Sequence, residues 1–426
     1  MNKRLLIISP YFPPSNAADM QRVRMSLPYF AQFGWDAEVV TVAPEYSDMP
    51  KDELLLQSIP GDIPIHEVKA VNKSLTAKFG LGSIALRSLR SYRQKVNRLL
   101  SQKHFDLVYF STTQFPVCIL GAYWKRKFNV PYVIDMQDPW HSDYYRDKPK
   151  NQRPPKYWFS YRLNKYLEPK AMRHADGLIS VSESYITTLK TRYPGIKNIP
   201  AKTITFGAFE PDMLIAENNK DAFEPLLNKA FVNIVYIGRG GTDMHKAIRP
   251  LFKTLKDGLE AEHELFSKVK LYFIGTSYAP AGLGQPTILP LAREFGIEKQ
   301  VVEFTDRVSY YHTLTTLQQA DALFIPGSDD PKYTASKIYP YLLTQKPLLA
   351  IFNPQSSAIS ILKEYGAKYV YSYESDHEAG ISNFLKQVVN GTLSHTEYNA
   401  AAIAKYAAEN MAEAQCLLFD MVLNSK

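Results

Sequence analysis

Cysteine is scarce in this sequence of 426 residues, which contains only Cys118 and Cys416. Two thiols so far apart, each in apolar surroundings, give no basis for a disulfide framework or a thiolate metal site, and they fit a reducing cytoplasm. Long hydrophobic runs are also missing. The apolar run at residues 5–8 is cut at Pro10, far short of the roughly 20 residues that a membrane-spanning helix needs. We therefore expect neither a signal peptide nor a transmembrane helix.

Several nucleotide-binding and nucleic-acid-binding signatures are absent as well. The sequence has no GxGxxG dinucleotide fingerprint and no GxxxxGK[ST] phosphate loop. Positive charge is concentrated in the first half: residues 1–215 carry 30 Lys and Arg against 19 Asp and Glu, whereas residues 216–426 carry 20 against 23. This asymmetry indicates an anionic partner, either a nucleic acid or a membrane surface. Because RNP, helix-turn-helix and zinc spacings are missing, we expect no nucleic-acid partner and favour the membrane.

The composition and the hydrophobic pattern predict two α/β domains. Hydrophobic residues make up 45% of the chain and charged residues 22%, which is enough apolar material for two cores. Short β-branched and apolar runs alternate with longer helical patterns, as in parallel α/β layers. The runs that we expect to be strands are residues 4–9, 38–42, 107–110, 132–135, 177–181, 232–237, 269–274, 301–304, 322–325, 347–351 and 369–371.

The same pattern gives the domain bounds. It pauses in the polar stretch 210–229 and then restarts, so we predict doubly wound Rossmann-like domains at residues 1–208 and 230–395, facing a central cleft. We expect a long Ala-rich helix near residues 396–422 that packs back on the first domain. Ligands of such sheets bind beyond the carboxyl ends of the strands, so the loops at those ends are the places to look for chemistry.

Two loops of the first domain carry candidate residues. The first strand leads through Ser15, Asn16 and Ala17 into a helix that carries Arg22, an arrangement that suits a phosphate or a sugar hydroxyl. An ordinary βα turn is the alternative. A later strand ends in the sequence DMQDPW, which places Gln137 and Asp138 where they can bind sugar hydroxyls or act in catalysis. A structural turn is the alternative there.

Two loops of the second domain carry further candidate residues. Residues 238–246 read GRGGTDMHK, and the cations Arg239 and Lys246 can converge on a diphosphate across a glycine loop formed by Gly238 and Gly240. The alternative is a glycine-rich turn with two solvated cations. The loop after the strand at residues 322–325 leads to a helix and offers further donor-binding groups, namely Ser328, Asp329, Asp330, Ser336 and Lys337. The alternative is an ordinary capped helix.

In this order, the motifs resemble those of family-4 GT-B retaining glycosyltransferases, which build bacterial polysaccharides and glycolipids. The segments concerned are SPYFPP at residues 9–14, ADGLISVS at 175–182, YIGR at 236–239 and SKIYPYLLTQKP at 336–347. The resemblance implies a nucleotide-diphospho-sugar donor on the C-terminal domain, an acceptor on the N-terminal domain, and retention of configuration without a required metal or other cofactor. It also implies that Arg239 and Lys246 neutralise the leaving diphosphate, as catalytic residues alongside Gln137 and Asp138.

The sequence departs from the family at three positions. Two glutamates that usually contact the donor sugar and the nucleotide ribose are replaced by Lys332 and Pro340, so these contacts have to come from elsewhere. The histidine often found after the fourth of the predicted strands is Gln137 here, and a glutamine cannot exchange a proton.

Basic residues near residues 86–100 and 146–173 suit an anionic membrane. The first stretch carries Arg87, Arg90 and Arg93 along a helical pattern, and the second interleaves nine basic residues with aromatic ones. A solvated helix face is the alternative.

We expect a hexosyltransferase acting on a saccharide or lipid-linked acceptor, in the cytoplasm and peripheral to the inner face of the cell membrane. A GT-B sugar epimerase and a non-catalytic nucleotide- or glycan-binding module are the rival functions.

Overall fold

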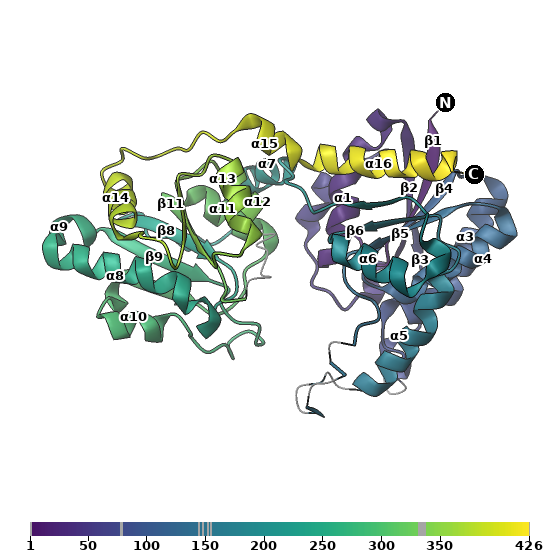
Figure 1. Ribbon diagram of the computed structural model, residues 1–426, viewed down its shortest axis with the longest axis horizontal. Helices are drawn as coiled ribbons and strands as arrows, with labels where there is room; N and C mark the ends of the chain where they lie inside the picture. The colour runs from purple at the N-terminus through teal and green to yellow at the C-terminus, as the bar shows by residue number, and fades with distance from the viewer. Residues whose placement is uncertain are drawn as a thin grey trace. The chain divides into compact units, whose positions relative to one another are not determined.

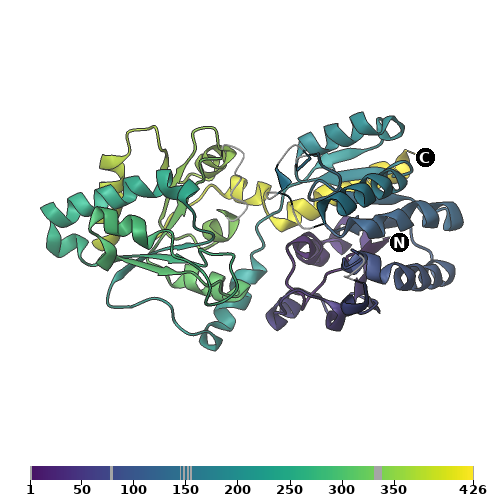
Figure 2. The same ribbon diagram turned by 90° about the horizontal axis from the view of Figure 1, so that it is seen from below.

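A computed structural model describes residues 2–76, 80–143, 145–146, 149–150, 153, 156–330 and 338–425. The chain forms two compact units (Figures 1 and 2). Unit 1 consists of residues 1–207 and 408–426, and unit 2 consists of residues 208–407. The polypeptide therefore passes between the units twice, near residues 207 and 407.

Unit 1 is built on a parallel seven-stranded sheet. Its strand order is β3-β2-β1-β4-β5-β6-β7, so the first strand lies inside the sheet and the chain builds outward from it in both directions. The strands are β1 (Lys3–Ile8), β2 (Trp35–Val42), β3 (Ile65–Val68), β4 (Leu107–Ser111), β5 (Tyr132–Met136), β6 (Gly177–Ser180) and β7 (Ala201–Thr203). The helices are α1 (Gln21–Ser26), α2 (Lys73–Thr76), α3 (Ile84–Gln102), α4 (Ile119–Phe128), α5 (Tyr157–Met172), α6 (Glu183–Arg192) and α16 (Ala408–Asn424).

Unit 2 repeats this plan on a parallel six-stranded sheet with the order β10-β9-β8-β11-β12-β13. Its strands are β8 (Val232–Ile237), β9 (Val269–Ile274), β10 (Val301–Phe304), β11 (Ala322–Pro326), β12 (Leu348–Phe352) and β13 (Tyr369–Ser372). Its helices are α7 (Pro211–Asn218), α8 (His245–Ala261), α9 (His263–Phe266), α10 (Leu289–Phe295), α11 (Tyr310–Gln319), α12 (Ile338–Leu343), α13 (Ser357–Glu364), α14 (Glu378–Val389) and α15 (Ala400–Lys405). The fold class predicted from the sequence, two doubly wound α/β domains, is confirmed.

The central strands are nearly continuous apolar runs because both faces of a parallel sheet are covered by helices. Strands β4 and β11 are buried along their whole length. Each expected strand is present within one or two residues of its predicted bounds, except that β2 begins earlier, at Trp35. Strands β3 and β7 were not predicted, because they are short edge strands with polar residues, reading IHEV and AKT.

The stretch near residues 208–230 belongs to unit 2, where α7 packs against α11. Buried Asp212 accepts hydrogen bonds of 2.8 Å from the hydroxyls of Tyr310 and Tyr311, and the side-chain amide of Gln318 donates to the carbonyl of Met213 at 3.0 Å. The segment is therefore a docked helix of the second unit and not only a linker.

The Ala-rich run near residues 396–422 forms two helices, α15 in unit 2 and α16 in unit 1. The ring of Phe419 on α16 lies 5.4 Å from that of Trp35 and 5.0 Å from that of Tyr109. The Gln415 side chain is also buried, and its amide donates to Ser26 Oγ on α1 at 2.7 Å. Helix α16 thus completes the core of unit 1.

Candidate functional site

Both sheets have a topological switch point, the place beside the first strand where the strand order reverses. In unit 1 the switch lies between β1 and β4, and in unit 2 it lies between β8 and β11. Open α/β sheets bind ligands in the crevice at the carboxyl ends of the strands at this point. The loops that follow β1, β5, β8 and β11 are those that the sequence singled out.

In unit 1, Asp19 joins the loop after β1 to the loop after β4. Its side chain is buried, and one carboxylate oxygen accepts hydrogen bonds from Thr112 Oγ1 (2.8 Å), Thr113 N (2.9 Å) and Thr113 Oγ1 (3.1 Å). Three donors on one oxygen fix the start of α1 relative to β4. Nothing local in the sequence points to Thr112 and Thr113 as the partners of Asp19.

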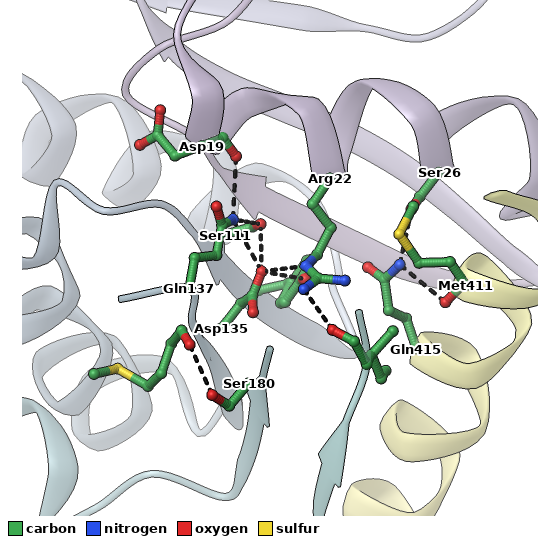
Figure 3. Close-up of polar contacts among 12 residues, drawn as sticks. Asp19, Arg22, Ser26, Ser111, Asp135, Gln137, Ser180, Met411 and Gln415 are labelled. Carbon is green, nitrogen blue, oxygen red and sulfur yellow. Dashed lines mark hydrogen bonds and ion pairs between the residues drawn. The ribbon is translucent and has the colours of Figure 1, made fainter. Parts of the chain in front are cut away.

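Gln137 extends this network to β5 (Figure 3). Its side-chain nitrogen donates to the carbonyl oxygen of Asp19 (3.1 Å), Ser111 Oγ (3.1 Å) and Asp135 Oδ2 (3.0 Å). The side chain is buried, so the amide group ties the start of α1 to the ends of β4 and β5. Gln137 therefore shapes the sheet edge where the resemblance places a histidine.

Asp138 is the exposed group of this edge. It directly follows Gln137 at the end of β5, and the pKa of its carboxyl is raised by partial desolvation in the loop and then by the negative charge of Asp19. Two residues along the chain, Trp140 is buried, and its ring is stacked on that of Phe115 at 5.5 Å between centroids. The Asp138 carboxyl group thus lies in a packed loop and is open to solvent.

Arg22, which the sequence placed in a phosphate-binding loop, is fully buried, so this assignment is wrong. Its Nε lies 2.6 Å from Asp135 Oδ2 (Figure 3), and its Nη2 donates to the carbonyl of Ile204 at 2.7 Å. Its guanidinium also lies over the ring of Phe206, 4.8 Å from the centroid. The side chain anchors residues 204–206 to the core, and no part of it is exposed to a ligand.

The loop after β1 is also less open than predicted. The backbone N–H of Ser15 donates to the carbonyl of Phe12, that of Asn16 to Pro50, and that of Ala17 to Ser15. These three amides are consequently engaged within the chain, and they are not free to bind a phosphate as the sequence suggested. The candidate donors in this loop are the side chains of Ser15 and Asn16, of which Ser15 is buried.

In unit 2, Asp243 connects the two loops at the switch point. It accepts hydrogen bonds from Arg239 Nη1 (3.0 Å) and Nη2 (2.6 Å) and from Ser328 Oγ (2.7 Å), and its carbonyl accepts from Asp329 N (2.9 Å). Hydrogen bonds from Arg239 are the main cause that lowers the pKa of the Asp243 carboxyl. The guanidinium group is therefore fixed in direction and partly neutralised, whereas the sequence predicted only a cation facing a ligand.

The glycines of this loop pack against protein atoms. A Cβ on Gly240 would lie 2.7 Å from Thr287 Oγ1 and 2.9 Å from Thr276 Cβ, and one on Gly238 would lie 2.5 Å from the Tyr236 hydroxyl. Any side chain at these two positions would push the loop away from its neighbours. The sequence assigned them to close approach by a ligand, but tight internal packing already requires glycine.

Lys246 lies in the first turn of α8 and is exposed. Within the described part of the chain it has neither an ion-pair nor a hydrogen-bond partner. Asp329 and Asp330 are exposed near the end of β11, where the amide of Asp330 donates to Ser328 Oγ at 3.2 Å. Ser336, Lys337 and Lys332 lie outside the described residues, and Pro340 lies within α12.

One buried cluster near Asp138 was missed by the sequence. Glu168 of α5 is fully buried and accepts from the backbone N–H of His141 (2.8 Å), from Arg192 Nη1 (2.5 Å) and from the Tyr193 hydroxyl (2.7 Å). Burial, followed by the charge of Arg192, lowers the pKa of the His141 imidazole. Its Nε2 is buried and has no hydrogen-bond partner among the residues that the structure describes.

Unit 1 also contains an open cavity of about 620 Å³ at the ends of β2 and β3. Its polar lining includes Thr41, Glu53, Glu67 and Lys95, and its apolar lining includes Leu56 and Ile65. Carboxylates and an ammonium group around an apolar floor suit a hydroxylated ligand. Among the described ranges, no group of three or more His, Cys, Asp or Glu could hold a metal ion, and no helix there is long and apolar enough to span a bilayer.

Comparison with known proteins finds one family match, in unit 1, and similar folds among solved structures. The sequence model of Glycosyltransferase Family 4 matches residues 23–205, most of unit 1. The curated proteins compared contain no match to the chain. The fold is similar to the N-terminal domain of Candida albicans trehalose-6-phosphate phosphatase, at 13% identity with a TM-score of 0.54, covering 100% of this chain and 96% of that one.

Two further solved structures have the same architecture. A trehalose-6-phosphate synthase has 12% identity and a TM-score of 0.53, covering 98% of this chain and 99% of that one. An alpha,alpha-trehalose-phosphate synthase (UDP-forming) from Burkholderia xenovorans, in complex with glucose-6-phosphate, has 10% identity and a TM-score of 0.50, covering 99% of both chains. The chain therefore has the GT-B fold of glycosyltransferases, and residues 23–205 match glycosyltransferase family 4.

Proposed function

We propose that this protein transfers a hexosyl unit from a nucleotide-diphospho-sugar to a hydroxyl of a saccharide or lipid-linked acceptor, with retention of configuration. The family match in unit 1 and the GT-B fold support glycosyl transfer. In this proposal unit 2 binds the donor, and unit 1 binds the acceptor at the inner face of a bacterial membrane, where polysaccharides are built. The charge supports that location, because unit 1 carries 31 Lys and Arg against 20 Asp and Glu, and unit 2 carries 19 against 22.

The observation that carries the proposal is the oriented Arg239 at the switch point of unit 2. Asp243 holds the planar guanidinium group by two hydrogen bonds, and Lys246 adds an exposed positive charge at the start of α8. A diphosphate carries more charge than one carboxylate and so competes with Asp243 for Arg239. Preoriented cations of this kind stabilise charge that develops on a leaving diphosphate. With these two cations in place, we expect no metal requirement.

In unit 1, Asp138 is the group that we assign to the reacting sugar or acceptor hydroxyl. It is exposed at the end of β5, and the network of Gln137, Asp135 and Asp19 holds its loop. The cavity lined by Glu53, Glu67 and Lys95 offers space for more of the acceptor. Several weak hydrogen bonds from such groups orient a saccharide hydroxyl, which is the main task of an enzyme whose leaving group is already activated.

The proposal is tested first by nucleotide binding. Calorimetric titrations with UDP, ADP and GDP, and then with their hexose conjugates, identify the donor; UDP comes first because one structure of the same fold is a UDP-forming enzyme. The matched variants are Lys246→Gln and Arg249→Gln. Both change an exposed cation of α8, but Arg249 is paired with Glu294 at 3.0 Å. Binding that is weakened only by Lys246→Gln supports the assignment.

Product analysis then separates the functions. With the donor so identified, a new glycoside indicates transfer, an isomerised free sugar indicates an epimerase, and an unchanged donor indicates a binding module. The anomeric configuration of the glycoside, read by NMR coupling constants, decides whether the reaction retains or inverts. No binding of any nucleoside diphosphate would refute the proposal.

A further inference from the structure

We propose that unit 1 docks on anionic lipid bilayers through a single surface, and that exposed apolar side chains of this surface enter the headgroup region. The surface consists of the exposed side of α5 together with residues 71–76 and 80–82, and we call it the α5 surface. The inference deepens the proposed membrane location, and it does not depend on which sugar is transferred or on the identity of the acceptor.

The exposed side of α5 combines cations with aromatic rings. Its positions are three or four residues apart, so they share one side of the helix; they are Trp158, Arg162, Lys165, Tyr166, Lys170 and Arg173, the last immediately after the helix. The structure describes α5 in full, and its one acidic residue, Glu168, is buried. The exposed side therefore carries positive charge without a compensating acid.

The aromatic side chains on this side lie outside the core. Trp158 is 65% exposed and Tyr166 is 62% exposed. The Lys170 ammonium lies 4.1 Å from the centroid of the Tyr166 ring, and the Arg162 guanidinium lies 5.8 Å from that of Trp158. Exposed aromatic rings beside cations are typical of residues at the boundary between bilayer and water, where the ring is apolar and its surroundings are charged.

Residues 71–76 and 80–82 bring further apolar side chains to the same end of unit 1. Gly80 packs directly on the ring of Phe159, since a Cβ at that position would lie 2.7 Å from Phe159 Cε1. In this segment Leu75 is 67% exposed and Leu81 is 39% exposed. Figure 1 shows the N-terminal end of α5, where Trp158 and Phe159 lie, extending beyond the strands of unit 1.

Arg87 of α3 supports the α5 surface from inside the protein. The sequence placed Arg87 on a membrane-facing helix side, and this is wrong, because the residue is 5% exposed. Its guanidinium donates to the carbonyls of Val71 (2.8 Å), Gly82 (3.2 Å) and Tyr46 (3.0 Å). Arg87 thus holds the two ends of the segment that carries Leu75 and Leu81. It supports the surface from inside and does not contact lipid.

This composition predicts two separable contributions to binding. Each basic residue near an anionic surface contributes about 1 kcal/mol, or about fivefold in affinity, and salt screens this contribution. The apolar side chains add a contribution that salt does not screen. Vesicle binding should therefore fall with rising salt and level off above zero.

Trp158 provides a direct probe of insertion. Of the four tryptophans, Trp35, Trp124 and Trp140 are buried in the core and Trp158 is exposed. We expect the full-length protein to show a blue-shifted fluorescence on phosphatidylcholine vesicles that contain phosphatidylglycerol, with quenching by lipids brominated near the headgroup. Trp158→Phe should remove the change in signal and keep most of the binding, because phenylalanine is also apolar.

Sedimentation with the same vesicles tests the charges. A variant with Arg162, Lys165, Lys170 and Arg173 changed to Gln should bind anionic vesicles on the order of several hundredfold more weakly. The matched control changes four exposed lysines of unit 2 to Gln, namely Lys256, Lys268, Lys363 and Lys368, and so alters the net charge equally. Leu75→Ser with Leu81→Ser should remove the part of binding that persists at high salt. Circular dichroism confirms that each variant is folded.

The outcomes decide the proposal. Equal loss in the unit 2 control would show that only net charge matters, and binding without quenching of Trp158 by brominated lipid would show that nothing inserts; either result overturns it. A single-stranded oligonucleotide that displaces the protein from anionic vesicles, and that binds it as tightly as the vesicles do, would reassign the surface to nucleic acid. Unchanged vesicle binding in a variant that cannot bind nucleotide keeps this inference distinct from the proposed reaction.

Discussion

Changing Arg22 to methionine should destabilise unit 1 strongly without affecting nucleotide binding by unit 2. The wild-type side chain is fully buried, forms a 2.6 Å ion pair with Asp135, and donates to the carbonyl of Ile204. Methionine fills part of the volume but leaves the Asp135 carboxylate buried without its cation. Tyr109, Ser111 and Gln137 still donate to that carboxylate, but they are neutral.

The size of the effect follows from these contacts. Breaking a buried ion pair by removal of one partner costs about 3–5 kcal/mol. For a unit of this size each kcal/mol lowers the midpoint of thermal unfolding by about 2–4 °C, so we expect a loss of about 6–20 °C. Differential scanning calorimetry measures the unfolding midpoint of unit 1. A saturating nucleoside diphosphate raises the midpoint of unit 2 and so separates the two transitions.

A double-mutant cycle provides the control. The Arg22→Met, Asp135→Asn double variant removes both charges, so it should lose much less stability than the sum of the two single changes. If Arg22 bound a phosphate instead, Arg22→Met would keep the wild-type melting temperature and lose affinity for nucleoside diphosphates. That result would refute the structural role that we assign to this ion pair.

Three further predictions concern the candidate site. Arg239→Ala and Lys246→Ala should each weaken binding of a nucleoside diphosphate by about 1.5–3 kcal/mol in calorimetric titrations, and unchanged affinity in both would remove them from the donor site. Asp138→Asn should reduce turnover far more than nucleotide affinity, so a kcat that equals the wild-type value would contradict its role. Because Arg239 lowers the pKa of Asp243, the stabilisation from this pair is complete above the unfolded pKa near 4 and is lost as the pH falls through the lower folded value. Acid unfolding of unit 2 should therefore be less steep in Asp243→Asn, and identical acid profiles would show that the pair does not contribute.

Most of the fold could be predicted from the sequence, because buried parallel strands consist of local apolar runs. Strands β8, β9 and β10 begin and end at the residues that the sequence predicts for them. Strands β3 and β7 could not be predicted in this way, since each is short, polar and paired on one side only. Their strand conformation depends on the neighbouring strand and not on their own composition.

The positions of the candidate loops at the strand ends were predictable from the sequence, but the contacts of their side chains were not. Sequence patterns place Gln137 and Asp138 at the end of β5, because the end of a strand is a local feature. The role of Arg22 depends on Ile204, which is 182 residues away, and on Asp135, so a helical arginine near a loop could not be distinguished from a phosphate ligand. Arg239 and Asp243 are only four residues apart, but the pair lies in a loop, so no helical periodicity pointed to it.

The position of α16 has a consequence for how the chain is made. Unit 2 is a continuous stretch of polypeptide, whereas unit 1 is assembled from segments on both sides of it. During synthesis, residues 1–207 emerge first, but the aromatic face formed by Trp35 and Tyr109 has no cover until Phe419 leaves the ribosome. Unit 1 therefore remains incomplete, with apolar surface exposed, until the whole of unit 2 has been translated. We therefore expect chaperone dependence to be a property of unit 1, and we expect a premature stop codon before α16 to leave unit 2 native and unit 1 aggregation-prone.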